Sequence, residues 1–258
     1  MRVFAISDLH VDYDVNAAWV ASLSTADYRE DVLILAGDVT DRLPLLDWCL
    51  STLTLRFGTV LFVPGNHDLW VLRDRARHDS VDKTSLQKFA DVAAVVASCG
   101  ASMSAFRADA LCIVPLFGWY DYSFGLPGKE LLEMWMDYHT CRWPEGMGVQ
   151  EIAAHFFAMN AKHPPAGGGK IITFSHFMPR IDLMPATVPA DKRLLYPILG
   201  STQLDRQLRK LQSTLHVYGH SHVNRRVQID GVTYINNAFG YPQEERIASK
   251  SLVCIETA

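Results

Sequence analysis

The stretch VLFVPGNHD, residues 60–68, changes abruptly from apolar to polar side chains. Its first half is short, apolar and rich in β-branched residues, which is typical of a buried strand. Gly65 then removes Cβ bulk at a point where the backbone must turn sharply. The amide, imidazole and carboxylate groups of Asn66, His67 and Asp68 follow this turn. The stretch therefore predicts a buried strand with polar side chains at its carboxyl end.

Four other apolar runs of the chain end in the same way. The polar groups that follow them are DLH at 8–10, GD at 37–38, SH at 175–176 and GHSH at 219–222. Ligands of open α/β sheets bind at the carboxyl ends of the strands, where side chains from separate strands converge. In a D-x-H or H-x-H segment, alternation along an extended chain puts both side chains on one side. We therefore expect a single site built from these strand ends.

Short apolar runs alternate with helix-period segments over most of the chain. Strands are expected at 2–7, 32–36, 60–64, 111–114, 171–174 and 215–218. Helices are expected at 15–23, 44–57, 83–98 and 203–212. A final hairpin is expected to pair 226–229 with 233–236 around the two-residue turn signal Asp230-Gly231. This order predicts an α/β fold with a largely parallel first half and a mixed or antiparallel second half.

The segment from about 119 to 169 differs from the rest because it is rich in tryptophan and tyrosine. It ends in HPPAGGG, residues 163–169, a sequence typical of a flexible break. We interpret it as helices and loops inserted over one edge of the sheet, and as a candidate lid. For its aromatic residues, packing is favoured over substrate stacking. Because the sequence shows no repeat and no interdomain linker, residues 1–258 are expected to form a single domain.

The composition is that of an ordinary globular protein. Hydrophobic residues make up 49% and charged residues 20% of the 258 residues, and the formal net charge is −4. These values exclude a disordered chain, a collagen-like repeat and a polytopic membrane protein. No apolar run approaches the roughly 20 residues of a membrane span. A nucleic-acid partner is not expected, because phosphate-backbone binding needs a basic stripe.

The cysteines are scattered, odd in number and without a C-x-x-C pair, at positions 49, 99, 112, 141 and 254. This spacing favours reduced thiols over a disulfide framework or a zinc knuckle. The first apolar run is too short for the core of a signal peptide. We therefore expect a cytoplasmic protein, and the sequence leaves its oligomeric state open.

The side chains expected to converge are oxygen and nitrogen donors without a thiolate, which disfavours a structural zinc site. They are Asp8, His10, Asp38, Asn66, His176, His220 and His222. Taken singly, Asp8 or Asp38 could cap a helix and His176 could be a core histidine, but the joint pattern argues against both. His216 lies inside an apolar strand and is expected to be a core residue.

The blocks D-x-H, G-D, G-N-H-D, a lone His and G-H-x-H follow one another between residues 8 and 222. In this order they resemble the calcineurin-like metallophosphoesterases over nearly the whole chain. The resemblance implies a four-layer α-β-β-α sandwich of two mixed sheets, with the metals at one sheet edge. The motifs V-P-G-N-H-D and G-H-x-H are most similar to those of the bacterial phosphodiesterase-type branch.

The resemblance also implies two divalent metal ions, for which Mn, Fe or Zn are candidates. It assigns Asp8, His10, Asp38 and His222 to the first metal. It assigns Asp38, Asn66, His176 and His220 to the second metal, so that Asp38 bridges the two. In such a site a hydroxide bridging the metals attacks the phosphate ester, since a metal pair can lower the pKa of a shared water and hold the phosphoryl oxygens.

Three further residues match functional positions of the family. His67 matches the acid that protonates the leaving oxygen, and Asp41 matches the position that orients this histidine in many members. Arg42 falls where the protein-phosphatase branch places a phosphate-binding arginine. Asp68 is expected to support the backbone of the G-N-H turn and is not among the expected ligands.

The departures from family patterns narrow the expected function. Leu43, Pro64 and Asp68 replace residues of the G-D-x-V-D-R-G and R-G-N-H-E blocks, so a classical Ser/Thr protein phosphatase is disfavoured. We expect hydrolysis of a small-molecule phosphate ester, with a phosphodiester or nucleotide-like substrate favoured. The alternatives are a non-catalytic metal-binding interaction scaffold of the same fold, a phosphomonoesterase or protein phosphatase, and a nuclease. All ligand positions and His67 are filled, which favours an enzyme.

Overall fold

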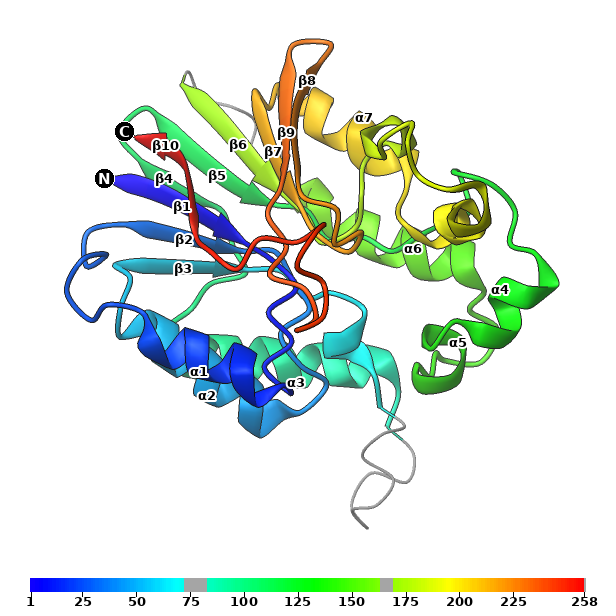
Figure 1. Ribbon diagram of the computed structural model, residues 1–258, viewed down its shortest axis with the longest axis horizontal. Coiled ribbons are helices and arrows are strands. Elements are labelled where there is room, and N and C mark those ends of the chain that lie inside the picture. The colour runs from blue at the N-terminus through cyan, green and yellow to red at the C-terminus, as the bar shows by residue number, and fades with distance from the viewer. Residues whose placement is uncertain (72–82, 163–168, 258) are drawn as a thin grey trace.

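The computed structural model describes residues 1–71, 83–162 and 169–257. Two β-sheets lie face to face and helices cover the outer side of each, which gives the predicted four-layer α-β-β-α sandwich (Figure 1). The strand orders are β10-β1-β2-β3 in one sheet and β4-β5-β6-β7-β9-β8 in the other. Both sheets are mixed, so the predicted fold class is confirmed.

The first sheet is built from three parallel strands and one antiparallel edge strand. The parallel strands are β1 (Arg2–Ile6), β2 (Val32–Leu35) and β3 (Thr59–Phe62), and β10 (Val253–Thr257) runs antiparallel beside β1. Side chains alternate between two cores. Val3 and Ala5 face the core shared with the second sheet, whereas Phe4 and Ile6 face the core under the helices. The sheet is therefore buried on both faces.

The second sheet has a parallel centre and antiparallel edges. Its strands are β4 (Phe106–Ala108), β5 (Leu111–Pro115), β6 (Lys170–Phe174), β7 (Leu215–Tyr218), β8 (Arg225–Ile229) and β9 (Val232–Asn236). Strands β5, β6, β7 and β9 run parallel, and β4 and β8 pair antiparallel at the edges. The predicted hairpin is confirmed: Asp230 and Gly231 have φ values of 48° and 82°, as a two-residue turn with two positive φ angles requires.

The helices begin and end close to the predicted positions. Helices α1 (Asp14–Ser22), α2 (Leu43–Thr54) and α3 (Ser85–Ser98) cover the first sheet (Figure 1). Pro44 lies in the first turn of α2, as expected, and Thr84 and Gln87 form a reciprocal capping box at the start of α3. Helix α7 (Thr202–Lys210) covers the second sheet and buries Leu204 and Leu208.

The inserted segment contains α4 (Lys129–Met134), α5 (Asp137–Thr140) and α6 (Val149–Met159). Helix α6 lies on the second sheet, whereas α4 and α5 lie at one end of the molecule (Figure 1). Trp119, Tyr120 and Phe156 are fully buried in the main core, so these aromatic side chains do pack as expected. Most of the proline- and glycine-rich break, 163–168, lies outside the described residues. Within the described residues no helix is long and apolar enough to cross a bilayer.

Candidate metal centre

The side chains predicted to form a site do meet, in the loops that follow β1, β2, β3, β6 and β7. Backbone hydrogen bonds hold these loops together. Asp8 N–H donates to the Gly37 carbonyl at 2.9 Å, and His10 N–H donates to the Asp38 carbonyl at 3.0 Å. The loop after β7 is joined to the loop after β6 by Gly219 N–H, which donates to the His176 carbonyl at 2.9 Å.

The backbone of this region adopts an unusual conformation at most of the expected ligands. Left-handed φ angles occur at Asp8 (54°), His10 (42°), Asp38 (55°), His220 (67°) and His222 (53°). For a residue with a Cβ atom this conformation costs roughly 1–3 kcal/mol, and it persists only where the surroundings hold it. Such strain clusters at functional sites. Here it occurs at loop residues whose side chains belong to the groups of ligand atoms described below.

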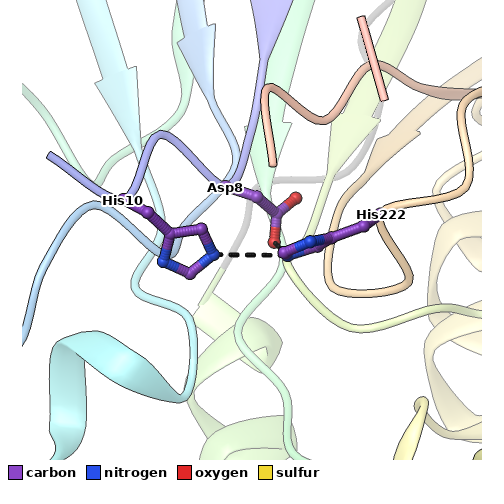
Figure 2. A group of neighbouring side chains, drawn as sticks. All are labelled: Asp8, His10 and His222. Carbon is purple, nitrogen blue, oxygen red and sulfur yellow. Dashed lines mark hydrogen bonds and ion pairs between the residues drawn. The ribbon is translucent and has the colours of Figure 1, made fainter. Parts of the chain in front are cut away.

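The first group consists of Asp8, His10 and His222, whose ligand atoms all lie within 4.8 Å of one another (Figure 2). His222 Nε2 lies 3.3 Å from His10 Nε2 and 3.2 Å from Asp8 Oδ1. The other ring nitrogen of His222, Nδ1, is 2.6 Å from Glu244 Oε2. A carboxylate on Nδ1 fixes the ring so that Nε2 faces the centre of the group.

The second group consists of Asp38, His176 and His220. His176 Nε2 and His220 Nδ1 are 3.1 Å apart, and Asn66 Oδ1 is 3.1 Å from His176 Nε2. The remaining ring nitrogens contact backbone carbonyls: His176 Nδ1 lies 2.9 Å from Ala36 O, and His220 Nε2 lies 3.0 Å from Ile198 O. Each histidine therefore directs its other ring nitrogen at the centre of the group, where a cation could bind.

Asp38 connects the two groups. It belongs to the second group and to a further one with His10 and His67, and His10 belongs to the first. Its Oδ1 accepts the His67 backbone N–H at 2.9 Å and lies 3.5 Å from His176 Nε2. The Asp38 carboxylate therefore lies within reach of His176 in the second group and of His10 in the first group, as a bridging ligand requires.

Burial and the neighbouring carboxylates shift the pKa values of the groups at this centre. Burial lowers the pKa of His10, His176 and His220, which keeps these rings neutral and their lone pairs available. For His222, burial is outweighed by the Asp8 and Glu244 carboxylates, which raise its pKa to about 10. Burial and the nearby Asp8 and Asp68 carboxylates raise the pKa of Asp38. Closely spaced buried carboxylates of this kind are compensated by bound metal ions in proteins.

Asp68 has the supporting role expected for it. Its carboxylate accepts hydrogen bonds from the backbone N–H groups of Asp38, Val39, Thr40 and Gly65, at distances of 2.8–3.1 Å. It thereby ties the loop after β2 to the loop after β3. A Cβ atom on Gly65 would lie 2.1 Å from Asp38 Oδ1, so only glycine fits at this position.

His67 lies beside the first group and contacts two aromatic residues. Its imidazole stacks on Trp70, with ring centroids 3.7 Å apart, and its Nε2 lies 3.4 Å from the Tyr241 hydroxyl and 3.8 Å from Asp38 Oδ2. Asp41 is buried, and its carbonyl accepts a hydrogen bond from Lys88 Nζ. Arg42 is exposed at the start of α2.

Sequence reasoning missed two residues of the C-terminal segment. The Tyr241 ring stacks on His10 at 4.4 Å, and Glu244 binds His222. Lys250 holds their loop in place by donating hydrogen bonds to the carbonyls of Phe239, Gly240 and Tyr241. No spacing pattern in the sequence marks these residues, because each acts from a loop without repeating structure.

The groups open into a cavity of about 250 Å³. Its polar lining residues include Asp38, Asn66, His67 and the histidines of the G-H-x-H block. Its apolar lining residues, here called the apolar wall, are Trp135, Leu195, Ile198 and Leu199. The cavity can therefore hold a charged group against the cations and an apolar chain beside it.

Comparison with known proteins points to the same chemistry. A family model described as calcineurin-like phosphoesterase matches residues 1–224. The acyl-carrier-protein phosphodiesterase PptH of Mycobacterium tuberculosis is 29% identical over 273 aligned residues, which cover 95% of this chain and 79% of that protein. The crystal structure of phosphopantetheinyl hydrolase (PptH) from the same organism matches with a TM-score of 0.77 and 25% identity, over 95% of this chain and 91% of that one.

Proposed function

The chain belongs to the calcineurin-like phosphoesterase family and is a metal-dependent phosphoric ester hydrolase, and from this premise we propose that it cleaves a phosphodiester with two bound divalent cations. The residues that would hold the first cation are Asp8, His10, Asp38 and His222. The residues that would hold the second are Asp38, Asn66, His176 and His220. The observation that supports this most is that His176, His220 and His222 each have one ring nitrogen occupied by a protein acceptor and the other directed at the shared centre.

Two cations held by these residues would supply an ionised water at neutral pH and would neutralise charge on the phosphoryl oxygens. We propose that His67 supplies the proton for the leaving group, because His67 lines the cavity and its ring stacks on Trp70. Burial lowers the pKa of His67, and the negative charge of a bound phosphate would oppose that effect. Asp41 and Arg42 remain candidates for orienting His67 and for binding phosphate.

We propose that the substrate is a phosphodiester that joins a phosphopantetheine arm to a carrier protein. The names of the two comparison proteins describe this class of substrate for them. In the present chain the apolar wall of Trp135, Leu195 and Leu199 would contact the arm while the phosphate lies on the histidines. A nucleotide-like diester remains the second candidate for the same cavity, and the cytoplasmic location expected from the cysteines remains part of the proposal.

The test is incubation of the Mn²⁺-loaded protein with a holo-acyl carrier protein. We expect mass spectrometry to show conversion of the carrier protein to its apo form and release of 4′-phosphopantetheine. Bis-p-nitrophenyl phosphate serves as a small diester, and p-nitrophenyl phosphate as a monoester. If only the small diester is cleaved, the protein is a phosphodiesterase but the proposal of a carrier-protein substrate is wrong. Two bound cations without hydrolysis of any ester would support the scaffold alternative.

A further inference from the structure

Asp137 is a buried carboxylate in α5, within the inserted segment, that the motif analysis did not identify. Its side chain accepts hydrogen bonds from three N–H donors and is also hydrogen-bonded to the Tyr120 side chain. Oδ1 accepts from Asn66 Nδ2 at 2.8 Å and from Trp70 Nε1 at 2.7 Å, and Oδ2 accepts from Trp135 Nε1 at 2.8 Å. All three donors belong to side chains at the metal centre, although they come from two distant parts of the chain.

The contact with Asn66 decides which end of its amide faces the second group. Because the NH₂ end donates to Asp137, the carbonyl oxygen Oδ1 is left facing His176 Nε2 at 3.1 Å. In the opposite orientation the NH₂ group would point at the histidines, where a cation needs an electron pair, and two oxygens would face each other. Asp137 therefore selects the orientation of the amide that can bind a cation.

The two tryptophan contacts extend this influence to the neighbouring rings. Trp70 stacks on His67, with centroids 3.7 Å apart, and Trp135 packs edge-on against His220 at 5.9 Å. Only a group that accepts hydrogen bonds at both oxygens can receive all three N–H donors at once. A carboxylate does so, whereas an amide would turn an NH₂ group toward at least one of the donors.

We propose that Asp137 is a positioning residue: it fixes the Asn66 amide for the second cation and so makes the inserted segment part of the metal centre. This inference rests on the two-cation site proposed above. It concerns cation binding, which can be measured without any hydrolysis. Cation binding could therefore still be tested if the protein hydrolysed none of the esters.

The test is isothermal titration of the metal-free protein with Mn²⁺. Wild-type protein is expected to bind two Mn²⁺ ions. In Asp137→Asn the affinity for one of the two is expected to fall about 10- to 100-fold, the usual effect of removing a partner that orients a ligand. The affinity for the other ion is expected to stay unchanged, because His10 and His222 do not contact Asp137.

The matched control is Asp121→Asn, a carboxylate of the same segment that accepts hydrogen bonds from the Ser201 hydroxyl and the Ser123 backbone. It is expected to bind both ions as the wild type does. The proposal is wrong if folded Asp137→Asn binds two ions with wild-type affinities, or if Asp121→Asn shows the same selective loss.

A second variant tests the positioning role of Asp137 if Asp137→Asn does not fold. In the pair Asn66→Asp with Asp137→Asn, the amide and the carboxylate exchange places and the hydrogen bond can form in the reverse direction. We expect this pair to fold and to bind two ions, with the second affinity closer to wild type than in any folded single variant. A pair that does not fold would assign Asp137 a role in folding alone. A pair that folds and binds one ion would show that the hydrogen bond between residues 66 and 137 does not position a ligand of the second cation.

Discussion

At Asp38, stability and cation binding make opposite demands on one buried side chain. Only 2% of the surface of Asp38 is exposed. This burial, together with the nearby Asp8 and Asp68 carboxylates, raises the pKa of Asp38. In the metal-free protein this charge is therefore costly. It becomes favourable when cations occupy the centre, since it contacts both groups of ligands.

Asp38→Asn is therefore expected to change the stability of the metal-free protein and the stabilisation by Mn²⁺ in opposite directions. Without metal, the variant should be more stable than wild type, because burial and the neighbouring carboxylates disfavour the charged form of Asp38 and an amide carries no charge. With Mn²⁺ added, it should lose most of the stabilisation that the wild type gains. Thermal unfolding of both proteins in EDTA and in Mn²⁺ measures this. A variant that is less stable in EDTA but retains the full response to Mn²⁺ would contradict the bridging role.

His67 allows a prediction about the leaving group. His67→Gln should bind Mn²⁺ like the wild type, because the proposed ligands remain. It should slow esters with poor leaving groups by about 10²- to 10⁴-fold, the usual contribution of a general acid. Esters of p-nitrophenol, which leaves without a proton, should be affected much less. Comparing kcat/KM for the two kinds of ester tests this, and equal losses would assign His67 to binding instead.

Residue by residue, the sequence predicted what the side chains could do but not how they are held. The seven expected donors lie together, Asp68 supports the turn, and His216 is buried beside Thr173 and Ser175. The left-handed backbone at the ligands depends on contacts between loops from distant strands. A single sequence does not record such contacts, and Glu244 and Tyr241 were missed for the same reason.

Among the elements, the C-terminal loop makes an unexpected contribution to the site. Glu244→Ala should weaken Mn²⁺ binding at the first group about 10- to 100-fold, because His222 loses the partner that fixes its ring. The neighbouring Glu245 is exposed, so Glu245→Ala is the matched control. Isothermal titration of both variants measures the effect. If both bind Mn²⁺ equally well, the His222 ring does not need Glu244.

The strands that the sequence did not predict are short edge strands. Strand β4 (FRA) and strand β10 (VCIET) contribute few buried side chains, and only Ile255 of β10 is fully buried. Without a run of apolar residues, neither gives a periodic signal. Their positions follow from pairing with β5 and β1, which depends on the folded sheets. The central strands, which are apolar on both faces, were predicted to within two residues.

For the molecule as a whole, the inserted segment is part of the core. Helix α6 buries Ile152 and Phe156 in the core shared with the second sheet. Deletion of 119–169 is therefore expected to prevent folding instead of simply changing substrate preference, and circular dichroism of the deleted chain tests this. A folded chain with altered specificity would restore the simpler interpretation as a detachable lid. Substitutions confined to α4 and α5, such as Trp135→Phe, are the better probe of a lid.

The buried histidines should make the stability of the metal-free protein sensitive to acid pH. Burial lowers the pKa of His216 to about 3, and burial also lowers the pKa of His10, His176 and His220. The unfolded chain binds protons at these groups near pH 6.5, whereas the folded chain does not until the pH is much lower. These histidines should therefore lower the unfolding free energy as pH drops below about 6.5, by on the order of 1 kcal/mol per pH unit for each proton taken up by the unfolded chain alone. The raised pKa of Asp38, and that of Asp68 at about 6, act in the opposite direction.

The contribution of one buried histidine to this pH dependence can be measured at His216, because His216 contacts Thr173 and Ser175 and is not an expected metal ligand. In His216→Gln the unfolding free energy in EDTA should fall less steeply between pH 6 and pH 4 than in the wild type, by the contribution of one proton. Urea unfolding at each pH gives both slopes. Mn²⁺ should stabilise both proteins near pH 7, by about 2.7 kcal/mol at a concentration 100 times its Kd. That stabilisation should fade in acid as protons compete for the ligand histidines, so a gain from Mn²⁺ that is constant from pH 7 to pH 5 would mean that the histidines do not bind the ions.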